Sequence, residues 1–115
     1  FIDQRSHARQ TVDLEISHRD LEGEEWHDAH LSTISKGGVR VETNRELPEG
    51  AWQEVSLPLD QAYKGQERLN LQAEVRWGRT ASGLAGGRFS HQYGLAFASL
   101  TSEQESLLKR AYRLD

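Results

Sequence analysis

The sequence predicts a small all-β fold: a six-stranded antiparallel β-barrel followed by one C-terminal α-helix. Two observations carry this prediction. Apolar and polar residues alternate with a period of two along most of the chain, and the period becomes helical near its end. Strands with one polar face are typical of antiparallel sheets. Six such strands in 115 residues favour closure into a barrel, because closure removes exposed strand edges.

The strands follow one another between turn signals. A turn is expected at residues 47–50 (LPEG) and a hairpin tip at 83–87 (GLAGG), because proline and glycine dominate such positions. The alternation predicts strands at residues 11–17, 26–32, 39–43, 55–59, 69–77 and 93–97.

The strand at 69–77 has the clearest alternation. Its odd-numbered positions are apolar and its even-numbered positions polar. Trp77 is therefore expected on the core-facing side with Val75, and Arg76 on the outer side.

The last elements of the chain change period. Ser102 with Glu105 has the spacing of a capping box, which predicts a helix start. The apolar residues that follow share one helical face, which is expected to pack against the barrel. They are Leu107, Leu108, Ala111 and Tyr112.

Length and composition predict a single domain. We expect an arginine-bearing, flexible segment at 1–10, the barrel at 11–98 and the helix at 101–113. The chain begins at Phe1 and contains no methionine, so it is expected to be part of a longer chain. No apolar run approaches the length of a membrane helix, and no signal peptide is recognisable. With no cysteine there is no disulfide or thiolate site, and a cytoplasmic location is expected.

The net charge of −4 argues against a general DNA- or RNA-binding protein, which usually has a basic excess. Arginine nevertheless accounts for 11 of the 14 basic residues. Arginine suits the bidentate recognition of phosphates and guanine edges, although composition bias also explains the count.

The stretch TISKGGVRVET, residues 33–43, places a serine and two glycines ahead of a strand. One glycine satisfies a turn, and a second is expected where another group approaches the backbone closely. Ser35 offers a hydroxyl to the same space, and turn amides form concavities that bind anions. Gly37 and Gly38 are therefore candidate ligand-binding positions, although an ordinary hairpin explains the turn by itself.

Arg5 and Arg9 lie four residues apart, directly before the first predicted strand. Two guanidinium groups can bind phosphate oxygens and the O6/N7 edge of guanine, and can stack on its ring. Arginines near a chain terminus are also commonly just solvated, and the spacing alone does not separate these interpretations.

Other sites are not favoured. His27 and His30 lie three apart on a predicted strand, so they point to opposite faces and are interpreted as a surface pair rather than a metal site. The sequence contains no GxSxG, GxGxxG or GxxxxGK[ST] motif. We therefore expect no enzymatic activity, no metal and no cofactor.

The order of the pieces is more specific than any one of them. RSHAR precedes the first strand, LSTISKGGVRVET spans the second and third, and YGLAF ends the last strand before the helix. This order resembles the PilZ domain, the bacterial receptor module for cyclic di-GMP. That family's pattern is RxxxR followed by (D/N)xSxxG on a six-stranded β-barrel with a C-terminal helix. The resemblance covers nearly the whole chain.

The resemblance implies roles for individual residues. Arg5 and Arg9 would bind phosphate and guanine, Ser35 would be the motif serine and Gly38 its closing glycine. Gly37 is the additional glycine often found beside it. Cyclic di-GMP would be the ligand of a bacterial, cytoplasmic protein, although a parent chain could be membrane-tethered.

Two further positions are candidates. Thr33 replaces the family's Asp or Asn, and its hydroxyl is a weaker acceptor for the guanine N–H edge. Losing one charge-assisted hydrogen bond costs about 1.5–3 kcal/mol. Arg76 and Trp77 are candidate ligand contacts, with an exposed strand arginine and a core tryptophan as the alternatives. Whether one ligand molecule or two bind is left open.

The resulting hypothesis is a receptor that changes its conformation or partner surface when cyclic di-GMP binds. Its partner would be an effector protein or other domains of the parent chain. The alternative is a degenerate barrel that binds no nucleotide and acts as a protein-interaction adapter. Thr33 keeps that alternative open.

Overall fold

The described residues form six strands and one helix, and every strand and helix expected from the sequence is present. The computed structural model describes residues 9–63, 66–84 and 87–114, so Arg5 lies outside the described residues. The elements are β1 (Gln10–Asp20), β2 (His27–Ile34), β3 (Gly38–Thr43), β4 (Trp52–Tyr63), β5 (Gln66–Leu84), β6 (Phe89–Phe97) and α1 (Ser102–Tyr112).

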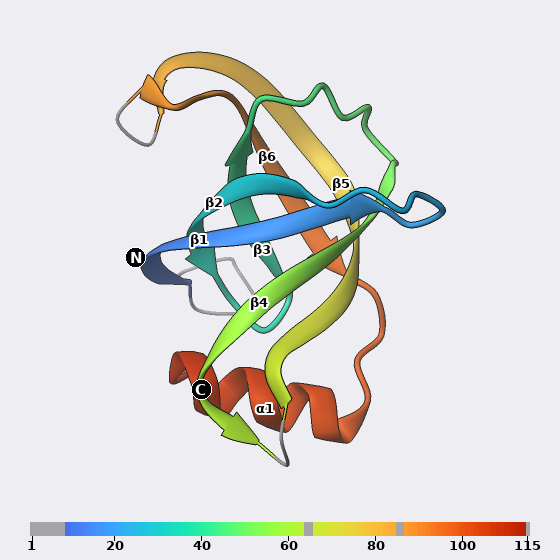
Figure 1. The fold of residues 1–115 in the computed structure, drawn as a ribbon, viewed down its shortest axis with the longest axis vertical. Coiled ribbons are helices and arrows are strands. Elements are labelled where there is room, and N and C mark those ends of the chain that lie inside the picture. Colours follow the sequence, from blue (N-terminus) through green and yellow to red (C-terminus); the bar gives the residue numbers. More distant parts are fainter. Residues whose placement is uncertain (1–8, 64–65, 85–86, 115) are drawn as a thin grey trace, which may run out of the picture.

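The strands form a closed antiparallel barrel in the order β1-β2-β3-β6-β5-β4. β1 pairs with both β2 and β4, which completes the ring. Figure 1 shows α1 lying across the lower end of the barrel, below β4 and β5. The predicted fold class is therefore confirmed.

The barrel interior is filled by the apolar residues of the period-two pattern. Val55 and Leu57 on β4 and Leu71 and Ala73 on β5 have at most 1% of their surface exposed. The core continues onto the helix, where Leu108 is fully buried and the Tyr112 hydroxyl donates a 2.6 Å hydrogen bond to the carbonyl oxygen of Pro58. These contacts fasten α1 to the barrel.

A β-bulge in β5 changes the direction of one predicted side chain. Val75 pairs with Leu95 and Trp77 pairs with Gly94, so Arg76 is an extra residue without an opposite partner on β6. The bulge turns Trp77 from the inner to the outer face of the barrel. The prediction that Trp77 packs in the core was wrong, because strict alternation cannot anticipate an inserted residue.

The helix begins with a capping box one residue earlier than expected. Thr101, not Ser102, is the N-cap: its hydroxyl accepts from the Gln104 amide at 3.1 Å, and the Gln104 side chain accepts from the Thr101 amide at 2.9 Å. The helix ends at Tyr112, and the C-cap residue Arg113 has a left-handed conformation (φ 55°) that closes the last turn. Among the described residues, no helix has the length and apolar character needed to cross a membrane.

His18 lies inside the barrel. His18 is 2% exposed and hydrogen-bonds through its ring nitrogens to the side-chain oxygens of Gln53 (2.9 Å) and Thr43 (3.3 Å). Burial disfavours the charged ring and lowers the pKa of His18 below its usual value. The fold therefore holds this imidazole in its neutral form.

Candidate functional site

A row of paired residues crosses the outer face of five adjacent strands. Because residues directly opposite one another on neighbouring strands point to the same side, the members of this row share one surface. From β1 to β5 the row is Thr11, Thr33, Arg40, Gly94 and Trp77.

Local sequence explains why these side chains face outward. Val39 and Val41 flank Arg40 and are buried in the core, so alternation turns Arg40 away from it. In β2 the register shifts between Leu31 and Thr33, which directs both Leu31 and Ile34 inward and leaves Thr33 outside. This irregularity places Thr33 directly opposite Arg40.

Arg9 reaches the same place from the beginning of β1. Its Nη1 donates a 3.2 Å hydrogen bond to the Thr33 hydroxyl. Arg40 is the cross-strand partner of Thr33, so two arginines lie on either side of one threonine. Of the two arginines singled out from the sequence, Arg9 therefore contacts the strand that leads into the glycine turn.

Trp77 lies flat over Gly94. A Cβ built on Gly94 would come within 2.1 Å of the indole Nε1 and 2.4 Å of Cε2, so only glycine permits this contact. The Arg40 guanidinium carbon is 5.3 Å from the centre of the Trp77 ring, a cation–π contact. Arg40 and Trp77 thus form a planar, half-buried pair on the outer surface.

Arg40 has unused hydrogen-bonding capacity. It forms no ion pair with any described carboxylate, and its Nε is buried without a hydrogen-bond acceptor in the part of the chain that the structure describes. A guanidinium in this condition favours an anionic or strongly accepting ligand.

The Ser35–Gly38 turn borders the row and is tied down internally. The Ser35 amide donates to the Gly38 carbonyl at 2.9 Å, and the Gly37 amide donates to the Ser35 hydroxyl at 3.2 Å. The Gly37 carbonyl also accepts from the Phe97 amide on β6 at 2.8 Å. Ser35 is buried, so its hydroxyl supports the turn rather than projecting from it.

Gly38 is required by the barrel itself. A Cβ there would lie 2.0 Å from the carbonyl oxygen of Leu95 on β6. The second glycine of the turn is expected from the sequence where a ligand approaches the backbone. At Gly38 the close approach of β3 and β6 is a sufficient structural reason.

A polar ladder lies in the next outward-facing row. The buried carboxylate of Glu42 accepts hydrogen bonds from His30 Nδ1 (2.8 Å) and Gln92 Nε2 (3.1 Å), and Arg79 Nε donates to Gln92 at 2.8 Å. His30 also contacts Asp13 through its other ring nitrogen.

The hydrogen bonds of this ladder stabilise the buried negative charge of Glu42, which lies in the row next to Arg40. Burial of the His30 ring opposes protonation, yet its hydrogen bonds to Asp13 and Glu42 and their charges together raise its pKa. When His30 is protonated, its positive charge offsets the negative charge of Glu42. His30 is thus not the surface residue that the sequence suggested; its side chain is 13% exposed. No metal-binding cluster occurs among residues 9–63, 66–84 and 87–114.

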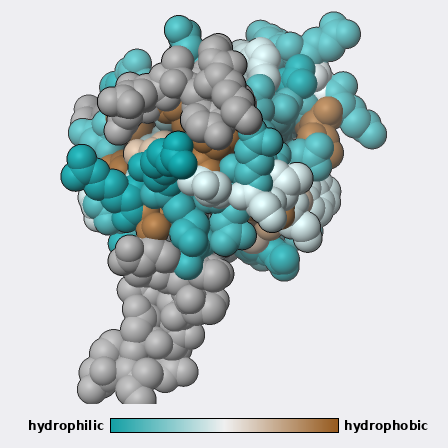
Figure 2. All heavy atoms as spheres, turned by 90° about the horizontal axis from the view of Figure 1, so that it is seen from below, coloured by the Kyte–Doolittle hydropathy of each residue, from teal (hydrophilic) through white to brown (hydrophobic). Residues whose placement is uncertain are grey.

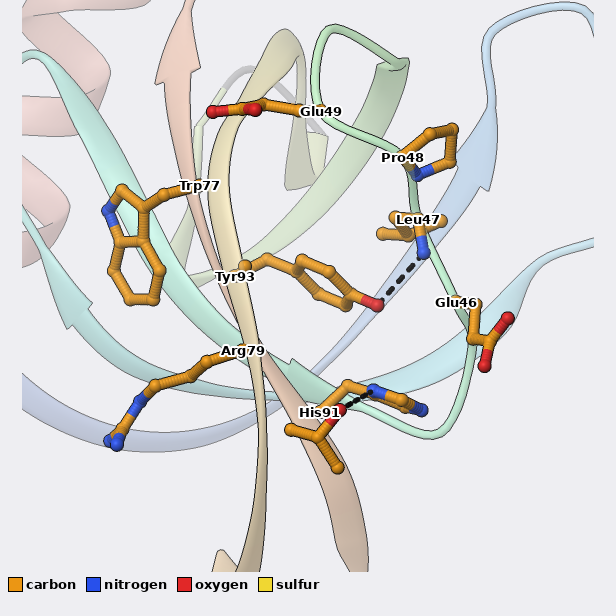
Figure 3. Close-up of a pocket in the computed structure, with 10 residues that line it drawn as sticks. Glu46, Leu47, Pro48, Glu49, Trp77, Arg79, His91 and Tyr93 are labelled. Carbon is orange, nitrogen blue, oxygen red and sulfur yellow. Dashed lines mark hydrogen bonds between the residues drawn. The ribbon is translucent and has the colours of Figure 1, made fainter.

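A hollow with a volume of about 580 Å³ adjoins the row at Trp77. In Figure 3, Trp77 and Arg79 extend from one side of β5, whereas Tyr93, Leu47 and Pro48 lie on the other. The Leu47 amide donates to the Tyr93 hydroxyl at 2.9 Å. Glu46 and Glu49 also line this hollow, so it is poorly suited to an anion.

The structure brings together most of the residues singled out from the sequence. Arg9, Thr33 and Trp77 belong to one surface, and the turn adjoins it. Arg76 does not join them: its side chain is 64% exposed and its Nε is 3.4 Å from a Glu74 carboxylate oxygen.

Sequence reasoning missed Arg40. The signal available was the alternation Val39-Arg40-Val41, which turns Arg40 outward directly after the motif glycines. Its neighbours could not be known, because they depend on strand register and on the bulge at Arg76.

Comparison with known proteins agrees with this architecture. The family model described as PilZ domain matches residues 3–113. No curated protein matches the chain.

Solved structures of low sequence identity share the fold. The PilZ domain of YcgR from Escherichia coli, in a structure with c-di-GMP, superposes with a TM-score of 0.72 at 16% identity, over 97% of this chain and 92% of that one. The K. pneumonia MrkH–c-di-GMP complex gives a TM-score of 0.68 at 11% identity, over 95% of this chain and 51% of MrkH.

The Bacillus subtilis inhibitor of motility, MotI/DgrA, gives a TM-score of 0.72 at 17% identity over 97% of this chain. The present chain spans about half of that protein, 51% of its length. A family model that matches nearly the whole chain, on a six-stranded barrel with a C-terminal helix, leads to one conclusion: this chain belongs to the PilZ domain family.

Proposed function

We propose that this chain is a cyclic di-GMP receptor whose ligand docks on the outer face of β2, β3, β6 and β5. The family is one of cyclic di-GMP receptors, and two structures that share this fold are complexes with that nucleotide. One observation carries the proposal for this chain: Arg9 and Arg40 both lie at Thr33, and Arg40 continues onto the indole of Trp77.

The chemistry of the ligand matches these groups. Cyclic di-GMP is a dianion with two guanine rings. Arg9, together with Arg5, binds its phosphate oxygens and a guanine edge. The planar Arg40–Trp77 pair offers a stacking surface for a guanine ring. Because the whole protein is acidic, with a net charge of −4, this local group of arginines supplies the attraction.

The turn contributes its shape rather than a free hydroxyl. The bonds of Ser35 to Gly37 and Gly38 hold the backbone in one conformation, and the ligand lies against that backbone. Thr33 accepts from Arg9 and orients its guanidinium toward the phosphate. Arg76 is an outer contact at most, since Glu74 competes for it.

The output of the receptor is a changed surface. Bound nucleotide fixes Arg5 and Arg9 against β2, and this alters what the beginning of the chain offers to an effector protein or to neighbouring domains. The protein acts as a bacterial, cytoplasmic sensor without a metal, cofactor or catalytic reaction.

Calorimetric titration tests the proposal. Cyclic di-GMP is expected to bind, whereas GTP and cyclic di-AMP serve as controls and bind far more weakly. Arg5→Ala and Arg9→Ala are each expected to remove most of the binding. Absence of heat with cyclic di-GMP at high micromolar concentration would overturn the assignment.

A second candidate is a nucleotide-free adapter with the same barrel. Thr33 favours it, because a hydroxyl stands where a carboxylate or amide would accept from the guanine N–H edge. An adapter would give no signal with any of the three nucleotides, so the same titration separates the two functions.

A further inference from the structure

The exposed large apolar side chains of the described residues gather on one surface. They are Leu21 (39% exposed), Trp26 (38%) and Trp52 (42%). All three lie on β1, β2 and β4 or directly beside them, away from the Arg40–Trp77 row. Such a gathering marks an interaction site more often than scattered single residues do.

Strand pairing makes these residues neighbours. Arg19 on β1 pairs with Glu54 on β4. Two residues further along the chain, the Leu21 amide donates a 3.3 Å hydrogen bond to the Trp52 carbonyl oxygen. On the other side of β1, the Arg19 guanidinium lies 4.8 Å from the ring centre of Trp26. The three apolar side chains and Arg19 therefore form a continuous patch.

A hollow accompanies the patch. It has a volume of about 500 Å³ and lies between the segment after β1 and the connection from β3 to β4. Both of these segments lie at the right-hand side of Figure 1. Half of its lining is apolar and half is polar or charged. The apolar residues are Leu21, Leu47, Pro48, Ala51 and Trp52, and the polar or charged ones are Asp20, Glu22, Arg45, Glu46 and Gln53. The apolar part of this lining suits an inserted apolar side chain of a partner, and its carboxylates suit basic residues beside it.

The charge around the patch is strongly negative. Arg19 and Arg45 are neutralised by Glu54 (2.6 Å) and Asp20 (3.0 Å). The remaining carboxylates are exposed and form no ion pair within the described part of the chain. They are Glu22, Glu24, Glu25, Glu46 and Glu49.

The helix end of the molecule is different. Figure 2 shows that face, where hydrophilic side chains predominate and hydrophobic ones show only in small areas of the described surface. Several exposed residues of α1 are polar or charged, including Glu103, Ser106 and Arg110. Among the described residues, the exposed large apolar side chains thus lie at β1, β2 and β4 and not on α1.

We propose that the surface formed by Leu21, Trp26, Trp52 and the surrounding glutamates, here called the acidic aromatic surface, docks a basic segment of a partner protein. An apolar side chain of that segment enters the hollow, and flanking Lys or Arg residues meet the five carboxylates. Complementary charge of this kind directs the encounter and fixes its orientation.

The charge argues against other occupants. A symmetric dimer through this surface would place the glutamates of two copies against each other. Anionic membranes and nucleic acids would be repelled. The inference does not depend on nucleotide binding, because it rests on different residues.

The three tryptophans permit a direct test by NMR. Each indole N–H gives one signal. Trp26 and Trp52 report on the acidic aromatic surface. Trp77 reports on the outer face of β2, β3, β6 and β5, here called the nucleotide face. The probe is a synthetic peptide with a central leucine pair flanked by lysines, with its ends blocked. It is expected to shift the Trp26 and Trp52 signals and leave the Trp77 signal in place.

Matched variants and peptides sharpen the test. Replacing the lysines of the peptide by glutamates is expected to abolish the shifts. Glu22→Lys combined with Glu24→Lys and Glu25→Lys is expected to weaken the lysine peptide by about tenfold or more, with an unchanged Trp77 signal as evidence of folding. Leu21→Ser is expected to weaken it while leaving the charge intact.

Several outcomes would overturn the inference. They are equal binding of the glutamate peptide, shifts at all three indoles, or no shift of Trp26 and Trp52 at millimolar peptide. Shifts with protein concentration alone would assign the surface to a second copy, and shifts with anionic phosphatidylserine vesicles would assign it to membranes. Cyclic di-GMP added to the same sample is expected to shift only Trp77, so each proposal fails separately.

Discussion

Two arginine–tryptophan pairs lie on different faces of this barrel, and their surroundings make them opposites. Arg19 lies 4.8 Å from the ring centre of Trp26, and Arg40 lies 5.3 Å from that of Trp77. Arg19 is bound to Glu54 at 2.6 Å, whereas Arg40 has no carboxylate partner among the described residues.

The comparison shows that counter-charge decides what such a pair can do. The carboxylate of Glu54 neutralises the charge of Arg19. The Arg19–Trp26 pair therefore belongs to a surface whose net charge is negative. Arg40 keeps its charge and lies opposite Thr33, beside Arg9. The same two residue types thus lie in a negatively charged setting on one face and in a positively charged setting on the other, which is the basis of the two proposed sites.

The largest expected effect comes from breaking the pair on the nucleotide face. Arg40→Ala removes a charge-assisted contact and half of the stacking surface. Calorimetry is expected to show cyclic di-GMP affinity reduced by about 10- to 100-fold. Arg19→Ala is the matched control, since it removes an arginine stacked on a tryptophan elsewhere; equal losses in both variants would contradict the comparison.

The second effect concerns the support beneath Trp77. In Gly94→Ala the new methyl group would meet the indole, whose Nε1 lies 2.1 Å from the Cβ position. We expect a loss of about 1–3 kcal/mol in the free energy of unfolding, measured with urea, and weaker nucleotide binding. In a Trp77→Ala background the same substitution is expected to cost nothing. A cost that persists there would mean that Gly94 serves another purpose.

A gain is expected at Thr33. Thr33→Asp places a carboxylate between Arg9 and Arg40 and restores an acceptor for the guanine N–H edge. Titration is expected to show cyclic di-GMP affinity raised by about tenfold, at the lower end of a charge-assisted hydrogen bond. Thr33→Val, which removes the acceptor at nearly constant volume, is the control and should bind more weakly. Unchanged or weaker binding of the aspartate variant would count against the role assigned to this position.

The smallest effects are on stability and depend on pH. The lowered pKa of His18 gives the fold stability that is present above about pH 6.5 and lost as the pH falls, because the unfolded chain binds the proton more readily. The raised pKa of His30 acts in the opposite direction: its contribution is present below about pH 6.5 and lost as the pH rises through the folded-state value.

The two histidines can be separated by thermal unfolding between about pH 5 and 8. His18→Gln is expected to lose less stability than the parent on acidification, and His30→Gln to lose more. Identical pH profiles for the two variants would show that neither ring titrates as its environment suggests.

The sequence was sufficient for the barrel and its helix, because period-two alternation and a helical stripe are local signals. The order of the motifs, through the family resemblance, also singled out Arg9 and Thr33, which form a hydrogen bond in the structure. Trp77 and Arg40 required the structure. The bulge at Arg76 reverses the face of Trp77, and the Thr33–Arg40 pairing depends on a register shift near Ser32.

The start of the helix cap and the reason for Gly38 also differ from what the sequence predicted. The capping box begins at Thr101, because the Gln104 side chain accepts a hydrogen bond from the Thr101 amide. Ser102 and Glu105 have the same spacing and equally suitable side chains, so the sequence alone cannot show which of the two pairs forms the box. The reason for Gly38 could not be known without the position of the Leu95 carbonyl oxygen. Both depend on neighbours that the chain supplies only when folded.

The most direct measurement is an indole NMR titration with cyclic di-GMP. Saturable binding that moves the Trp77 signal, spares those of Trp26 and Trp52, and disappears in Arg40→Ala is the predicted result. Saturable binding that leaves Trp77 stationary, or that survives in Arg40→Ala at full strength, would contradict a nucleotide site built on these two residues.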